Sequence, residues 1–178
     1  MITLYIALFI SYRKLKENEK NLRDEGLAKD VWFTIFFVQN GLAFYATWVS
    51  IASNLNFAIY MIWGLGADIE DAGTAALFLI LAATLVYFTL ENFIWRHYLI
   101  YTFSPWIVLL VALIGSLAKN WNAADPTRNN IITLLLLIIV IMLIIARVII
   151  FILYKTVCKH RFSNLRVSNS NKEIVHKV

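Results

Sequence analysis

Residues 131–154 have the sequence IITLLLLIIVIMLIIARVIIFILY and consist almost entirely of leucine, isoleucine and valine. A run of about twenty apolar residues is what an α-helix needs to cross the hydrocarbon core of a bilayer. In lipid, every backbone N–H and C=O must find a partner within the protein, and a helix provides these partners by itself. The stretch therefore predicts a membrane-spanning helix.

The composition of the whole chain agrees with this prediction. Hydrophobic residues make up 61% of the 178 residues and charged residues 15%, whereas soluble domains contain about 45–50% and about 25%. These values exclude a disordered chain and an ordinary soluble enzyme domain. The formal net charge is +5, and its basic residues flank apolar segments, which is typical of topology signals. We therefore expect the lipid bilayer as a partner, and no nucleic acid.

Three further apolar runs cover residues 31–63, 72–95 and 101–118. The first would form a helix about 50 Å long, so it must tilt, protrude or break, and residues 54–56 are the expected point of a break. In the third run, Pro105 falls in the first helical turn, where proline is tolerated. The predicted fold is all-α, a polytopic bundle with a four-helix transmembrane region over residues 31–154.

The first eleven residues, MITLYIALFIS, are apolar but too short to span. As a helix they would measure about 16 Å, and they lack the basic flank and cleavage site of a signal peptide. We expect a partial transmembrane helix over 1–11, as the second half of a span in a longer protein. The predicted architecture is therefore four full spans plus a short half span.

The segments between the apolar runs differ in charge. Residues 12–30 form a densely charged loop with a possible short amphipathic helix, and residues 155–178 form a basic tail. Residues 64–71 are acidic and contain no basic residue. Because basic segments stay on the cytoplasmic side, we expect the 12–30 loop and the tail in the cytoplasm and 64–71 outside. The sequence leaves plasma membrane and endomembrane open.

The first long apolar run carries small and polar side chains on one helical face. At 100° per residue, Trp48 falls on the opposite face. Such a stripe suits a tight helix–helix contact, and it also suits the wall of a polar pocket, so both interpretations stay open. Its members are Gln39, Ala43, Ala46, Thr47, Ser50, Ser53 and Asn54.

Glu91 and Arg147 are opposite charges inside the apolar runs. Together with Gln39 and Asn40 they lie at similar depths, within about 7–15 Å of the predicted inner surface at 1.5 Å per residue. Opposite charges at one depth are expected to find each other, which predicts a buried Glu91–Arg147 pair with amide partners. The alternative is that Arg147 extends to the inner headgroups along its long stem.

Motifs of known catalytic chemistry are missing from the sequence, including phosphate-binding loops, His-Glu-x-x-His and Gly-x-Ser-x-Gly. The histidines at 97, 160 and 176 are too dispersed to form a metal site together. We therefore predict no enzyme, no catalytic residue and no metal. Two functions stay open. In the first, the protein binds or carries a small hydrophobic ligand, in a pocket lined by Gln39, Asn40, Trp48, Ser50, Asn54 and Glu91.

The second function is that of a non-catalytic accessory or assembly subunit. Its polar helix face would then dock another membrane protein or a second copy of this chain. A binding protein needs a cavity beside the stripe, whereas a docking protein needs a filled, flat stripe. The structure of the stripe therefore bears on both functions.

The segment WVSIASNLN (48–56) resembles a Trp-aliphatic-Ser/Thr-aliphatic-Ala-Ser/Thr pattern that ends in Asn. This pattern is found in membrane proteins of the tryptophan-rich sensory protein and translocator (peripheral benzodiazepine receptor) family. The resemblance implies a helical bundle that binds flat hydrophobic ligands, so a tetrapyrrole or a sterol is the expected ligand, and no further cofactor is predicted. Longer flanks are similar to animal proteins of this kind: FISYRKL (9–15), VQNGLAFYATW (38–48), LENF (90–93) and DPTRN (125–129).

Overall fold

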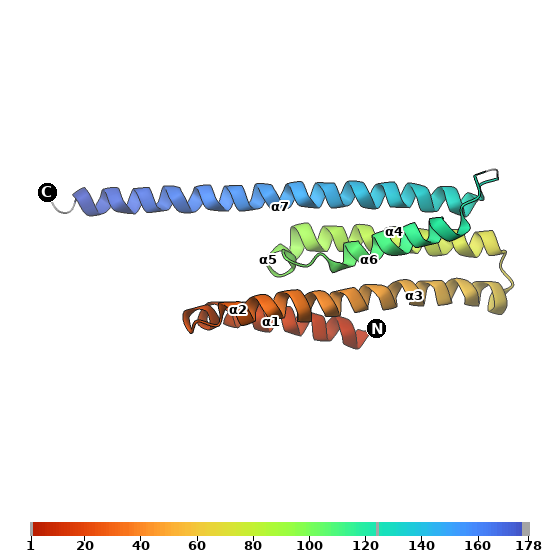
Figure 1. Ribbon diagram of the computed structural model, residues 1–178, viewed down its shortest axis with the longest axis horizontal. Helices are drawn as coiled ribbons and strands as arrows, with labels where there is room; N and C mark the ends of the chain where they lie inside the picture. The colour runs from red at the N-terminus through yellow and green to blue at the C-terminus, as the bar shows by residue number, and fades with distance from the viewer. Residues whose placement is uncertain (1, 124, 176–178) are drawn as a thin grey trace. The chain divides into compact units, whose positions relative to one another are not determined.

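The computed structural model describes residues 2–123 and 125–175, with side chains up to residue 156. All regular structure in this part of the chain is helical (Figure 1). In chain order the elements are α1 (Ile2–Asp24), α2 (Ala28–Phe33), the π-helical η1 (Thr34–Gln39), α3 (Asn40–Leu65), α4 (Ile69–Thr89), the π-helical η2 (Leu90–Ile94), α5 (Arg96–Leu99), α6 (Ser104–Asn120) and α7 (Arg128–Val175).

The chain divides into two compact units at Leu143, within α7. The first unit contains α1 to α6 and the start of α7, and the second contains the rest of α7. In the first unit, α3 is central: it contacts α1, α4 and α6, and Figure 1 shows it running beside α1 and α4. The candidate site lies in this first unit.

Three helical stretches are long and apolar enough to cross a membrane: Ala28–Leu65, Ile69–Ile94 and Arg128–Thr156. They correspond to three of the predicted spans. The fourth predicted span corresponds to α6, which is apolar but only 17 residues long. At 1.5 Å per residue it measures about 25 Å, somewhat less than the roughly 30 Å of a bilayer core.

Of the three alternatives for the long apolar run, a break near residues 54–56 does not occur, because α3 continues without interruption from Asn40 to Leu65. The irregular part of this long helix is η1, before Asn40, where the backbone takes the wider π-helical form. Asparagines 54 and 56 are poor helix formers, but tertiary contacts override this weak preference. One such contact is the hydrogen bond from Asn54 Nδ2 to Ala76 O of α4, at 2.7 Å.

The predicted half span and the charged segment after it belong to one helix. α1 runs from Ile2 to Asp24 without a boundary at residue 11. Gly26 follows the end of this helix, and its φ of +84° is readily accessible to glycine. Leu27 N donates to Leu22 O at 2.9 Å. This hydrogen bond, from an N–H to the C=O five residues earlier, is typical of the Schellman motif at the C-terminus of a helix.

Standard capping chemistry also defines the turn between α3 and α4. Gly66 takes the left-handed conformation with φ of +69° at the end of α3. Asp68 then caps α4, because its side chain accepts a hydrogen bond from Glu70 N at 2.8 Å. Acidic residues in the first turn of α4, Glu70 and Asp71, also favour the helix dipole.

The backbone of α7 continues beyond the predicted end of the fourth span at residue 154 and reaches Val175. The predicted basic tail thus begins as helix. Its side chains from residue 157 onward lie outside the described residues.

Candidate functional site

A cavity of about 490 Å³ lies among α1, α3, α4 and α6 in the first unit. Each of the four helices contributes part of the wall. Most of the wall is apolar. The lining residues are Tyr5, Thr47, Ser50, Ile51, Ser53, Asn54, Leu79, Ile80, Ala83, Thr84, Tyr87, Pro105 and Leu109.

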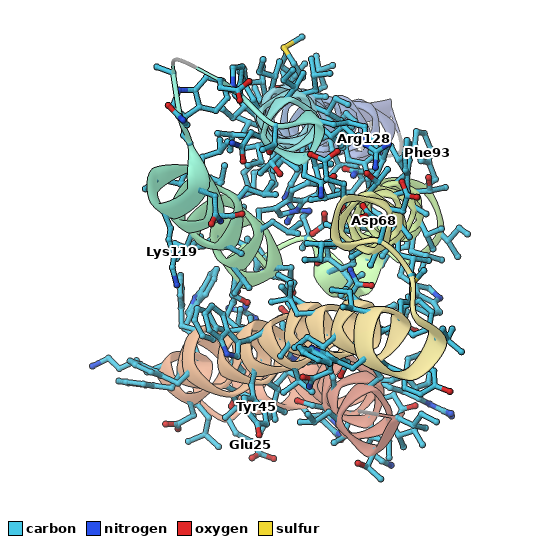
Figure 2. The ribbon with its side chains drawn as sticks, turned by 90° about the vertical axis from the view of Figure 1, so that its right-hand side faces the viewer. Glu25, Tyr45, Asp68, Phe93, Lys119 and Arg128 are labelled. Carbon is cyan, nitrogen blue, oxygen red and sulfur yellow. The ribbon has the colours of Figure 1, made fainter. Side chains whose placement is uncertain are left out.

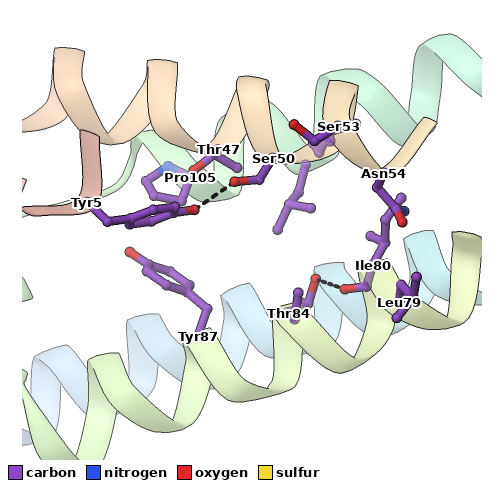
Figure 3. Close-up of a pocket in the computed structure, with 13 residues that line it drawn as sticks. Tyr5, Thr47, Ser50, Ser53, Asn54, Leu79, Ile80, Thr84, Tyr87 and Pro105 are labelled. Atoms are coloured by element: carbon purple, nitrogen blue, oxygen red, sulfur yellow. Dashed lines mark hydrogen bonds between the residues drawn. The ribbon is translucent and has the colours of Figure 1, made fainter. Parts of the chain in front are cut away.

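Figure 3 shows polar side chains at both ends of this cavity, with Ser50 and Thr84 between them. Tyr5 of α1 and Tyr87 of α4 face each other at one end, next to Pro105. Ser53 and Asn54 of α3 lie at the other end, across from Leu79 of α4. The cavity is therefore a mostly apolar space with two tyrosine hydroxyl groups at one end, and an amide and a serine hydroxyl at the other.

Tyr5 connects α1 to the cavity wall. Its hydroxyl lies 2.8 Å from Ser50 Oγ, and Ser50 Oγ also donates to Ala46 O at 2.8 Å. A serine hydroxyl has one proton, and a carbonyl can only accept. Ser50 therefore uses its proton on Ala46 O, so Tyr5 is the donor in the Tyr5–Ser50 hydrogen bond.

The wall is electrically neutral. None of the thirteen lining residues, all in the described first unit, carries an ionisable acid or base of the Asp, Glu, Lys, Arg or His type. A charged ligand group buried there would lack a partner, at a cost on the order of several kcal/mol in a low-dielectric site. Among the residues whose side chains are described, no group of three His, Cys, Asp or Glu could hold a metal ion.

The structure brings two of the six predicted pocket residues, Ser50 and Asn54, to the cavity. Trp48 does not line it and is 48% exposed, in agreement with its position opposite the stripe. The other three, Gln39, Asn40 and Glu91, also lie outside the lining. Gln39 is 4% exposed at the end of η1.

Asn40 joins the start of α3 to the segment before α6. Its Nδ2 donates to Tyr101 O and to Ile35 O, both at 3.0 Å. Its Oδ1 accepts from Phe103 N at 2.9 Å and from Ser104 N at 3.2 Å. These four bonds use both amide hydrogens and both oxygen lone pairs. Because they cap the N-terminus of α6 from another helix, the position of Asn40 is explained by the fold.

Glu91 is 2% exposed within η2. Its Oε2 accepts a hydrogen bond from Trp106 Nε1 of α6 at 2.8 Å, and its Oε1 accepts one from the Tyr87 hydroxyl at 3.2 Å. The Tyr87 and Trp106 rings also pack against each other, with centroids 5.8 Å apart. Tyr87 lines the cavity, so its hydrogen bond to Glu91 fixes the position of one residue of the cavity wall.

Arg147 belongs to the second compact unit, whereas Glu91 belongs to the first. The Glu91–Arg147 pair stays a prediction.

Four lining residues that the sequence argument did not select are Tyr5, Thr84, Tyr87 and Pro105. Tyr87 had a detectable signal, because it precedes Glu91 by one helical turn and so shares its face. Tyr5 had none, since nothing in the sequence indicates which helix the first apolar stretch packs against.

Both π-helical segments lie near these polar contacts. η1 ends immediately before Asn40, and η2 contains Glu91. π-Helical turns are rare and are frequent at functional sites. In η1, Ile35 O accepts both the backbone N–H and the side chain Nδ2 of Asn40, which compensates for the irregular backbone.

Comparison with known proteins gives no significant match to a family model, to a curated protein or to a solved structure.

Proposed function

We propose that this chain is an integral membrane protein that binds a small hydrophobic ligand in the cavity among α1, α3, α4 and α6. The observation that carries the proposal is the cavity itself. Its volume of about 490 Å³ falls in the range of about 300–1,000 Å³ that is usual for small-molecule sites. A wall of apolar side chains with a few polar groups is also usual for such sites.

The orientation of the polar stripe supports binding over docking. Ala43 and Ala46 are 2% and 1% exposed, and α3 contacts three helices of its own chain. Further along the stripe, Ser50, Ser53 and Asn54 line the cavity. A face that is covered by the chain's own helices is a poor surface for a second protein, so the accessory-subunit function is the second candidate.

The four-span bundle with a cytoplasmic tail is part of the same proposal. α6 would be the fourth span, shorter than the others. The resemblance to the translocator family suggests a tetrapyrrole or a sterol as the first ligands to try.

The experiment compares two substitutions on α4 in protein reconstituted in lipid nanodiscs. Ala83 lines the cavity, whereas its neighbour Ala82, which is exposed to the same degree, does not. Ala83→Phe should fill the space and reduce saturable binding of a photoactivatable sterol, or of the uncharged dimethyl ester of protoporphyrin IX, at least tenfold. Ala82→Phe should leave binding unchanged. Saturable binding that is equal in both variants, or no saturable binding in the original protein, would contradict the proposal.

A further inference from the structure

Five of the six hydroxyl groups of the cavity wall use their protons within the protein, and the sixth, that of Ser53, lies at the Asn54 end. Thr47 Oγ1 donates to Ala43 O at 2.8 Å, and Thr84 Oγ1 donates to Ile80 O at 2.7 Å. Ser50 donates to Ala46 O, Tyr5 donates to Ser50, and Tyr87 donates to Glu91 Oε1. Each of these five lining hydroxyl groups therefore donates a hydrogen bond within the protein.

A hydroxyl oxygen that donates its proton can still accept a hydrogen bond. Thr47, which is half-buried, and Tyr5, which is 45% exposed, keep this capacity in the cavity wall. A ligand that donates a hydrogen bond gains a new bond there. A ligand that only accepts must first displace an existing bond, such as the one from Thr47 to Ala43 O, and so gains little.

Asn54 is the exception in this wall. One amide hydrogen is used on Ala76 O, which leaves a second N–H and the oxygen. Asn54 lies at the far end of the cavity from Tyr5 and Tyr87 (Figure 3). The end with the tyrosines therefore presents acceptors.

From this arrangement we infer that the cavity selects a neutral apolar ligand with a hydrogen-bond donor, such as a long-chain or polycyclic alcohol, over an analogue that can only accept. The inference rests on the proposed function, because it presupposes that the cavity binds a ligand. The donor group of the ligand lies at the end where Tyr5 and Thr47 present their hydroxyl oxygens. The uncharged wall excludes carboxylate and phosphate groups from the same place.

The test uses two probes with the same C16 chain and the same photoreactive diazirine, one a primary alcohol and the other its methyl ether. Saturable labelling of the nanodisc-reconstituted protein is measured, and the labelled residues are located by mass spectrometry. We expect the alcohol to label cavity residues with an apparent affinity about threefold to tenfold higher than the ether, which is the size of one net hydrogen bond.

Variants assign this preference to individual hydroxyl groups. Thr47→Val keeps the side-chain shape and should abolish most of the preference. It should lower the affinity for the alcohol and leave the affinity for the ether unchanged. Thr89→Val is its matched control, because Thr89 makes the same bond, to Leu85 O at 2.9 Å, on an exposed face outside the lining. Tyr5→Phe should have the same effect as Thr47→Val, with the exposed Tyr45→Phe as its control.

The outcomes separate the two proposals. If both probes label the cavity saturably with equal affinity, the inference is overturned and the proposed function stands. If the alcohol is preferred but Thr47→Val and Tyr5→Phe leave that preference intact, the inference is also overturned. If neither probe labels the cavity saturably, both the proposed function and the inference fall.

Discussion

At one end of the first unit, the side chain of Asn40 joins α3 to the segment before α6, and Glu91 joins η2 to α6. We call this the clamp end. At the other end, Arg128 of α7 lies 2.6 Å from Asp71 and 3.9 Å from Glu70 of α4. We call this the acidic end. Figure 2 looks onto it, with Asp68 and Arg128 on neighbouring helices.

The two ends differ in how far their polar bonds are removed from water. Glu91 is fully buried, whereas the side chains of Arg128 and Asp71 are 47% and 69% exposed. A buried polar group that loses its partner costs about 1–3 kcal/mol, whereas an exposed ion pair contributes little because water and salt replace the partner. The clamp end is therefore expected to determine the stability of the bundle.

The largest effect is expected for Asn40→Ala. It removes four hydrogen bonds, three of them to backbone groups of Tyr101, Phe103 and Ser104. We expect the free energy of unfolding to fall by about 2–4 kcal/mol, measured by titration with dodecyl sulfate in mixed micelles. Asn18→Ala is the control, because Asn18 makes one exposed bond to Lys14 O. Equal effects of the two substitutions would contradict the role of Asn40.

The next effect is expected for the bond between Glu91 and Trp106. A double-mutant cycle with Glu91→Met, which removes the acceptor, and Trp106→Phe should give a coupling energy of about 1–2 kcal/mol, because the bond lies in a buried site. A coupling energy near zero would mean that the bond does not stabilise the fold. The predicted Glu91–Arg147 pair is tested by a second cycle with Arg147→Met, and it is wrong if the coupling energy between the two positions is near zero.

A smaller effect is expected at the acidic end, where α4 and α7 approach closely at Gly73. A Cβ at this position would overlap the Asn129 amide, which is held by Thr74 Oγ1 at 2.7 Å and by Glu70 O at 3.1 Å. We expect Gly73→Ala to lower the free energy of unfolding by about 1–2 kcal/mol.

The matched control for Gly73 is Gly115→Ala in α6. A Cβ at Gly115 meets nothing within 4 Å, so this change should stabilise the helix by up to about 1 kcal/mol. The two substitutions are therefore expected to change the free energy of unfolding in opposite directions. Stabilisation by Gly73→Ala would show that the two helices do not pack as described.

The sequence predicted the apolar helices well because the length of an apolar run is set by the bilayer and not by tertiary contacts. It predicted Pro105 in the first turn of α6 correctly. It did not predict the cavity end formed by Tyr5, because the pairing of α1 with α3 depends on contacts that have no local signal.

Asn40 shows a second reason why site residues are hard to select from a sequence. An amide inside an apolar run indicates a polar contact, but the partner can be a ligand or the backbone of another segment. Here the partners are backbone groups of the turn before α6. Ser50 and Asn54 were placed at the cavity for a simpler reason, because helical periodicity alone sets their face.

The exposed ion pair at the acidic end should respond to salt. Arg128→Gln removes both carboxylate contacts, and we expect a small loss of stability at low ionic strength that disappears as salt is raised, because exposed charges are screened. The measurement is the melting temperature in nanodiscs of neutral lipid at two salt concentrations. Asn40→Ala is the reference, since its loss should not depend on salt. A salt-independent loss in Arg128→Gln would show that Arg128 is more shielded than its exposure indicates.

The smallest effect is expected for the exposed Arg13–Glu17 pair on α1, the helix that also contacts α5 near the clamp end. The hydrogen bond from the Arg13 guanidinium lowers the pKa of the Glu17 carboxyl below its ordinary value. Because the folded pKa is lower than the unfolded one, the pair stabilises α1 above the ordinary pKa of glutamate, about 4.3, and this contribution is lost as the pH falls through the folded pKa.

Carboxyl ¹³C NMR of Glu17 measures this shift directly. Arg13→Gln should raise the pKa of Glu17 toward its ordinary value, while Lys20→Gln, which changes a nearby charge without touching this bond, should leave it in place. If Arg13→Gln destabilised the protein as much as Asn40→Ala, then position in the bundle and not burial would decide the strength of a polar contact. A small effect would attribute the difference between the two ends to the exclusion of water.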